Sequence, residues 1–162
     1  KIFLNSLSKA KISFNLLTPY FAPDSNFFKL ISKAKDRGVE VNLFLPLRSD
    51  YRLLVWIADF YARWARRAGA SVFFSRKMNH GKAMTVDSHT GFIGSINFTP
   101  RSFYYNEESG ILFQDKMMVK ELELIFDDLR ANAIQLNDEN FSSNSWPTKF
   151  KDWCSKQMGD WI

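Results

Sequence analysis

The chain has 162 residues, which is the size of one domain with a buried core. It is 46% hydrophobic and 24% charged, an ordinary globular composition that excludes collagen-like and disordered proteins. The net charge of +5 favours anionic partners, whether phospholipid headgroups, nucleic acid or a negatively charged membrane surface, and the lone Cys154 excludes an internal disulfide.

Helical and strand periodicities alternate along the first 70 residues. Two prolines, Pro19 and Pro23, stiffen a loop that carries Tyr20 at the carboxyl edge of the expected sheet, where ligands gather in open α/β folds. Ser25 is the expected cap of the helix that follows. We predict helices over 2–10, 25–36 and 52–68 and strands over 11–17 and 39–45.

The predicted helix 52–68 is apolar around much of its circumference, with an aromatic row at Trp56, Phe60 and Trp64. It is either buried on two sides, between the sheet and a second domain, or it presents an aromatic rim to acyl chains.

The second half continues the alternation after a polar loop at 75–79. Helix 116–133 is expected to bury Met118, Leu122, Ile125, Phe126 and Leu129. We predict strands over 71–74, 82–87, 92–93 and 109–114. The pattern predicts an α/β fold with a mixed sheet flanked by helices over residues 1–135.

Chemistry-bearing residues gather between positions 80 and 108. His80 and Lys82 are two apart beside a predicted strand, so an imidazole and an ammonium point the same way. Gly94 and Ser95, with Asn97 after them, add a hydroxyl and an amide where backbone approaches closely. Together these groups predict an anion-binding site.

This stretch resembles the signature of the phospholipase D superfamily, His-x-Lys-x4-Asp-x6-Gly-Ser-x-Asn. The matching residues are His80, Lys82, Asp87, Gly94, Ser95 and Asn97. Further segments resemble the C-terminal half of bacterial cardiolipin synthases, at 18–24, 37–41, 100–103, Asn106 and Glu108. The resemblance implies a phospholipase D-like sheet that forms one of the family's two repeats.

The resemblance also implies roles. Phosphatidyl transfer would proceed through a phosphohistidine, with Lys82, Ser95 and Asn97 holding phosphate oxygens and Glu108 orienting the His80 ring. Asp87 would act mainly in support of the structure. Tyr20, Arg48 and Arg101 are further candidates for the headgroup pocket, and no metal or other cofactor is expected.

A single motif histidine cannot be both nucleophile and acid, because the two flank phosphorus on opposite sides. The resemblance implies a second motif, from an N-terminal half or from another copy of the chain. His80 would then protonate the leaving alcohol. The alternatives are a homodimeric nuclease cleaving DNA or RNA, which the basic charge also suits, and a degenerate lipid-binding module, against which the intact motif argues.

The last segment, 136–162, reads as a linker followed by a short basic amphipathic helix that docks on the domain or lies in a membrane interface. No apolar run reaches the roughly 18 residues of a transmembrane helix. Because the chain opens with Lys1 inside a helical pattern, we expect a piece of a longer protein with any targeting segment upstream. The resemblance implies association with the bacterial cytoplasmic membrane and a phosphatidylglycerol-like substrate.

Overall fold

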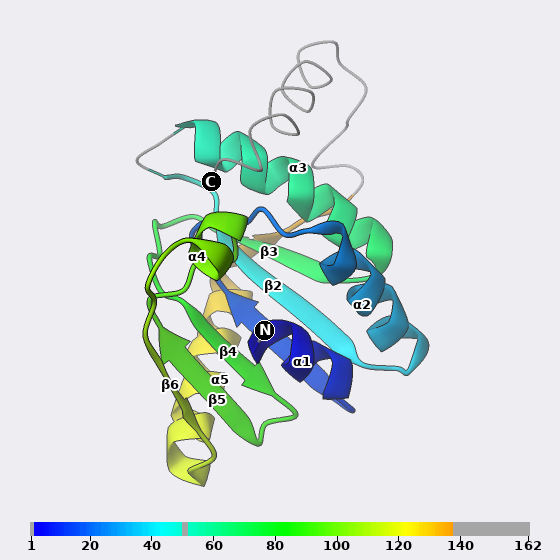
Figure 1. The fold of residues 1–162 in the computed structure, drawn as a ribbon, viewed down its shortest axis with the longest axis vertical. Helices are drawn as coiled ribbons and strands as arrows, with labels where there is room; N and C mark the ends of the chain where they lie inside the picture. Colours follow the sequence, from blue (N-terminus) through cyan, green and yellow to red (C-terminus); the bar gives the residue numbers. More distant parts are fainter. Residues whose placement is uncertain (1, 50–51, 138–162) are drawn as a thin grey trace.

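The computed structural model describes residues 2–49 and 52–137, which form one seven-stranded sheet with helices on both faces (Figure 1). The sheet has the order β6-β5-β4-β1-β2-β3-β7. In chain order the elements are α1 (Ile2–Lys9), β1 (Ser13–Leu17), α2 (Ser25–Asp36), β2 (Glu40–Pro46), α3 (Arg52–Ala68), β3 (Ser71–Ser75), β4 (Ala83–Val86), β5 (Thr90–Gly94), α4 (Pro100–Tyr104), β6 (Gly110–Phe113), α5 (Lys116–Asn132) and β7 (Ala133–Gln135).

The sheet is mixed, because one half is parallel and the other half is antiparallel. Strands β1, β2 and β3 are parallel and are joined by the crossover helices α2 and α3. Strand β4 runs antiparallel to β1, and β5 and β6 continue as antiparallel neighbours. The predicted α/β fold with a mixed sheet is confirmed.

Two hydrophobic cores lie on opposite faces of this sheet. Helices α1 and α2 cover one face, where Phe3 meets Phe92 edge-on with ring centroids 5.2 Å apart and Phe27 lies 4.5 Å from Phe98. Helix α5 passes behind β4 and β5 on the other face (Figure 1), and its Phe126 packs on Phe44 at 5.1 Å. Many of the chain's 16 phenylalanines therefore fill these cores.

Several expectations about the helices were wrong in detail. The N-cap of α2 is Asp24, whose carboxylate accepts from the Phe27 amide at 3.1 Å, and not Ser25. On α5 the side that faces the sheet carries Val119, Leu122 and Phe126. Met118 and Ile125, which were expected to be buried, lie outside that side and are 49% and 51% exposed. The short elements α4 and β7 were not predicted.

Helix α3 buries its small residues and leaves its aromatics half covered. Ala58, Ala62 and Ala65 face the sheet, whereas Trp64 is 48% exposed and lines an aromatic groove of about 560 Å³ with Phe28 and other residues of α2 and α3. Within the described residues, no helix has the length and apolarity that a membrane span requires. Nearly all of the predicted linker and C-terminal helix, from residue 138 on, lies outside the described residues.

Candidate active site

One edge of the sheet collects the polar residues of the motif. Strand β1 ends there before Tyr20, and β4 begins there after His80 and Lys82. Because β5 is antiparallel to β4, its end brings Ser95 to the same edge, and the start of β6 brings Glu108. His80 and Lys82 precede β4 rather than lying within it, so the turn before the strand aims their side chains.

The central contact of the site joins His80 to Lys82. The Lys82 ammonium donates to the ring Nδ1 of His80 at 2.8 Å and to the His80 carbonyl at 2.9 Å. Since an ammonium can only donate, Nδ1 presents its lone pair, and a neutral ring then carries its proton on Nε2. His80 itself is exposed. In this tautomer Nε2 is the ring's hydrogen-bond donor.

Lys82 supplies a fixed positive charge that is largely shielded from water. Its residue is 9% exposed, and burial lowers the pKa of the ammonium, an effect that the nearby Glu108 carboxylate partly offsets. A cation that is shielded from water stabilises a nearby negative charge more strongly than an exposed one does.

The Glu108 carboxylate is held by donors from the loop that precedes it. The hydroxyl of Ser95 donates to one carboxylate oxygen, and the amide of Asn106 donates to the other at 3.3 Å. Desolvation raises the pKa of Glu108, but the bonds from Ser95, Ser102 and Asn106, with the Lys82 charge, outweigh it and the net pKa is lowered. Glu108 is therefore a carboxylate across the neutral range.

The glycine of the Gly-Ser pair allows β5 and the start of β6 to meet. A Cβ at Gly94 would lie 2.5 Å from the Ser109 carbonyl oxygen, too close for any side chain. The Ser95 amide donates to that same carbonyl at 2.8 Å, and the Ser95 hydroxyl accepts from the Ser109 amide at 3.0 Å. Ser95 is thus locked between the two strands.

Asn97 carries an unsatisfied group. Its Oδ1 is buried and has no hydrogen-bond partner in the described part of the chain. The next residue is anchored, since the Phe98 amide donates to the Thr18 hydroxyl at 3.1 Å, and that hydroxyl donates to the Tyr20 carbonyl at 2.9 Å. Thr18, which the sequence did not single out, ties the Tyr20 loop to the Asn97 segment.

The outer candidates divide into one that reaches the site and two that do not. The Tyr20 ring meets the His80 ring edge-on, with centroids 5.7 Å apart. Arg48 and Arg101 are exposed, and neither forms a hydrogen bond or ion pair through its side chain within residues 2–49 and 52–137.

Asp87 lies at the opposite end of β4. Its carboxylate accepts from the backbone amides of Lys11, Ile12 and Ser13 at 2.7–3.0 Å, which fixes the entry to β1. Desolvation raises the pKa of Asp87, but the hydrogen bonds from these amides and the Lys11 charge lower it by more. The pKa of Asp87 is therefore below its ordinary value. The structure therefore does not bring Asp87 to the other motif residues.

One expected contact is absent. The sequence interpretation has Glu108 bonded to the ring of His80, but in the described chain Lys82 occupies Nδ1 and Glu108 is engaged by Ser95, Ser102 and Asn106. The segments around Ser102 and Asn106 were noted for their resemblance, yet no role was given to either residue. Their contacts with Glu108 could not be predicted from sequence spacing, because the loop that carries both residues must first fold back towards Glu108.

Metal-binding residues do not cluster in the described ranges. No group of three or more His, Cys, Asp or Glu side chains is placed there to hold a metal ion.

Comparison with known sequences places residues 3–130 in the family described as "Cardiolipin synthase, PLD-like domain". The chain is 38% identical over 138 residues to cardiolipin synthase A of Pseudomonas fluorescens, covering 85% of this chain and 29% of that protein. It is 30% identical over 157 residues to a cardiolipin synthase of Staphylococcus aureus, covering 96% of this chain and 32% of the other. The chain thus spans about a third of the length of these relatives.

Solved structures share the fold. Nuc from Salmonella typhimurium, a phospholipase D family member, superposes with a TM-score of 0.71 at 21% identity, over 84% of this chain and 89% of Nuc. Phosphatidylserine synthase of Haemophilus influenzae gives 0.76 at 15% identity, over 99% of this chain and 44% of that one. One unit of this fold is therefore nearly the whole of one neighbour and less than half of the other.

Proposed function

Because the chain belongs to the cardiolipin synthase family of phospholipase D-like domains, we propose that it supplies one half of an active site for phosphatidyl transfer. The substrates are phospholipid phosphodiesters of the phosphatidylglycerol type. The acceptor is the hydroxyl of a second phospholipid, of glycerol or of water. This activity is a phosphatidyltransferase and phospholipase D reaction without a cofactor of its own.

The observation that carries the proposal is the 2.8 Å contact between the Lys82 ammonium and Nδ1 of the exposed His80 ring. With Lys82 donating to Nδ1, the ring holds its proton on Nε2, which suits a general acid better than a nucleophile. The side-chain amide of Asn97 follows at the same edge as a donor for phosphate oxygens, whereas the hydroxyl proton of Ser95 is already given to Glu108.

The reaction then divides into two balanced steps. An opposing imidazole attacks phosphorus, the bond from phosphorus to the leaving alcohol breaks, and Nε2 of His80 gives its proton to that alcohol. In the second step the oxygen of the acceptor hydroxyl attacks the phosphohistidine, the phosphorus–nitrogen bond to the opposing imidazole breaks, and His80 takes the hydroxyl proton. The acceptor is joined to phosphorus, and both imidazoles return to their starting states.

The opposing imidazole comes from a second phospholipase D-like unit. His89, the other histidine of the chain, lies in the turn at the far end of β4 and cannot face the same phosphorus. A further half with its own motif, or another copy of this chain, completes the site.

Association with an anionic membrane surface follows from the substrate class and is favoured by the net charge of +5. Tyr20, whose ring meets the His80 ring edge-on, is the outer candidate that lines the headgroup pocket in this proposal.

A nuclease is the second candidate, since the chain covers 89% of Nuc and is basic. Such an enzyme would pair two copies of this unit and hydrolyse DNA or RNA phosphodiesters. Turnover of phosphatidylglycerol vesicles without cleavage of single- or double-stranded DNA or of RNA supports lipid transfer, and the reverse result selects the nuclease.

A burst experiment tests the role of His80 in the full protein. A phosphatidyl ester whose leaving group needs no proton should still give a stoichiometric burst with His80→Asn, followed by slow turnover. The natural phosphatidylglycerol reaction should be lost. A variant that loses the burst as well contradicts the assignment of His80 as the acid, and unchanged turnover on phosphatidylglycerol overturns the proposed function.

A further inference from the structure

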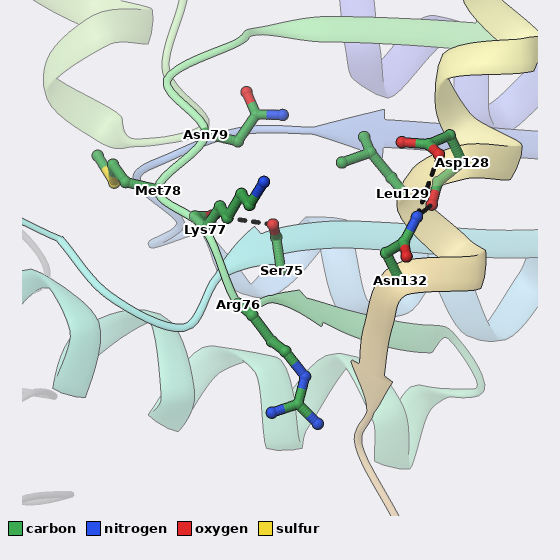
Figure 2. Close-up of a pocket in the computed structure, with 8 residues that line it drawn as sticks. All are labelled: Ser75, Arg76, Lys77, Met78, Asn79, Asp128, Leu129 and Asn132. Carbon is green, nitrogen blue, oxygen red and sulfur yellow. Dashed lines mark hydrogen bonds between the residues drawn. The ribbon is translucent and has the colours of Figure 1, made fainter.

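A cavity of about 580 Å³ with polar side chains on both walls opens beside the loop that leads into His80 (Figure 2). One wall is the loop after β3, with Lys77 and Asn79, and the other is the last part of α5, with Asp128 and Asn132. The motif interpretation uses none of these side chains. Their chemistry is cationic and amide on one side and carboxylate and amide on the other.

The loop wall holds its donors in place through local bonds. The Ser75 hydroxyl donates to the Lys77 carbonyl at 2.9 Å, which fixes the turn, and Figure 2 shows the Lys77 ammonium extended towards α5. Arg76 also lines the cavity but leads off to one side. Neither cation forms an ion pair in the part of the chain that the structure describes.

The helix wall offers acceptors. Asn132 donates to the Asp128 carboxylate at 3.1 Å and to the Asp128 carbonyl at 2.9 Å, which leaves one carboxylate oxygen and the Asn132 Oδ1 for other donors. Leu129 lies between the two walls. A ligand that bridges the cavity therefore needs an anionic end and a hydroxyl-bearing end.

We propose that this cavity binds a glycerol phosphate group, as the headgroup of a second phospholipid or as the free compound. The phosphate lies against Lys77 with Asn79, and the glycerol hydroxyls donate to Asp128 and Asn132. Lys77 faces the single carboxylate of Asp128, and Arg76 at the side of the cavity adds a further positive charge, so the surroundings favour an anionic phosphodiester over a zwitterion. A volume of about 580 Å³ lies within the usual range for small-ligand sites.

The cavity is coupled to the catalytic turn through Asn79. Its Oδ1 accepts from the Gly81 amide at 2.8 Å, so the side chain that borders the ligand also braces the residues on either side of His80. As a site for the acceptor headgroup, the cavity rests on the proposed function; as a binding site, it stands by itself.

Calorimetric titration of the full protein with glycerol phosphate tests the binding. Lys77→Gln should weaken it about tenfold, and Lys29→Gln, an equal charge change on the opposite face of the sheet, should leave it within twofold. Asp128→Asn should lower the preference for glycerol phosphate over inorganic phosphate about threefold, because the lost negative charge affects both anions alike whereas the weaker hydroxyl acceptor affects only glycerol phosphate. Equal effects of Lys77→Gln and Lys29→Gln would overturn the site.

Competing ligands sharpen the identity of the group. Glycerol alone should not bind, and inorganic phosphate should bind more weakly than glycerol phosphate. Tighter binding of phosphoethanolamine would overturn the glycerol assignment, since an ammonium would then be the group that Asp128 selects.

A turnover measurement distinguishes the sources of the headgroup. Under transfer conditions, Lys77→Gln should raise the KM for acceptor phosphatidylglycerol about tenfold with kcat within twofold, while hydrolysis by water stays unchanged. Binding without this KM effect assigns the cavity to free glycerol phosphate and rejects the acceptor role. If wild-type protein binds glycerol phosphate but transfers no phosphatidyl group, the proposed function fails and the binding site stands.

Discussion

The two ends of strand β4 carry residues of the same motif, but these residues have different surroundings and contacts. At the start, the exposed His80 and the buried Lys82 form a polar pair beside Ser95 and Glu108. At the other end, the Asp87 carboxylate accepts hydrogen bonds from three backbone amides at the start of β1. A four-residue strand separates these ends by roughly 13 Å, so one group cannot assist the other directly. A fixed spacing in sequence can thus record two separate constraints, one chemical and one structural.

The largest expected effect separates the two histidines that flank β4. His80→Asn in the full protein should lower turnover of phosphatidylglycerol vesicles by roughly 10³-fold, the scale of losing a general acid. His89→Asn, at the other end, should leave turnover within twofold. Urea unfolding midpoints of both variants should match the wild type, because both side chains are exposed. Equal losses of activity in His80→Asn and His89→Asn would show that the catalytic role is not confined to the His80 end of β4.

At the structural end, Asp87→Ala should lower the free energy of unfolding by about 2 kcal/mol, because the amides of Lys11, Ile12 and the half-buried Ser13 lose their shared charged acceptor. Asp115→Ala is the matched control: it removes a carboxylate that accepts from two amides of its own helix, Met117 and Met118, and should cost about 1 kcal/mol. Urea denaturation followed by tryptophan fluorescence measures both. Activity per folded molecule should change little in Asp87→Ala, and a loss comparable to that of His80→Asn would contradict the structural role.

Acid titration tests the same carboxylate without deleting it. The pKa of Asp87 is lowered on folding, so its stabilisation is complete above the ordinary aspartate pKa of about 3.9 and is lost as pH falls through the lower folded value. Wild-type stability should therefore fall more steeply than that of Asp87→Asn below about pH 4. If the stability of the two proteins falls equally steeply with decreasing pH, Asp87 is not the group whose protonation destabilises the fold.

Much of the fold followed from the sequence because periodicity and turn residues are local signals. Helix α3 has the predicted bounds, Arg52–Ala68, since Gly69 ends it in a left-handed conformation at φ 113°. The short strand β7 was missed because three residues show no period, and it exists only by pairing with β3. On α5, apolar Met118 and Ile125 fit a helical stripe as well as Val119 does, and the sheet it packs on decides which flank is buried.

The site was less predictable than the fold. The motif named His80, Lys82 and Ser95, and the strand order does bring them to one edge. The partners of Glu108 could not be deduced, because Ser102 and Asn106 reach it only after α4 turns the chain back. The side-chain contact between Lys82 and Nδ1 is likewise a product of the turn at 80–82, whereas the strand pattern predicted only that the two groups share a face.

The smallest expected effect concerns electrostatics at the chemical end. Glu108→Gln removes the charge that partly offsets the burial of Lys82, so the pKa of Lys82 should fall further and the alkaline limb of kcat/KM should move to lower pH. The free energy of unfolding should change by less than about 1 kcal/mol, because the amide retains acceptor and donor capacity for Ser95 and Asn106. Glu107→Gln, the neighbouring exposed carboxylate, is the control and should leave the pH profile in place. If instead Glu108→Gln shifts the acid limb and leaves the alkaline limb unchanged, Glu108 acts on the His80 ring rather than on Lys82, and the contact expected from the sequence forms during turnover.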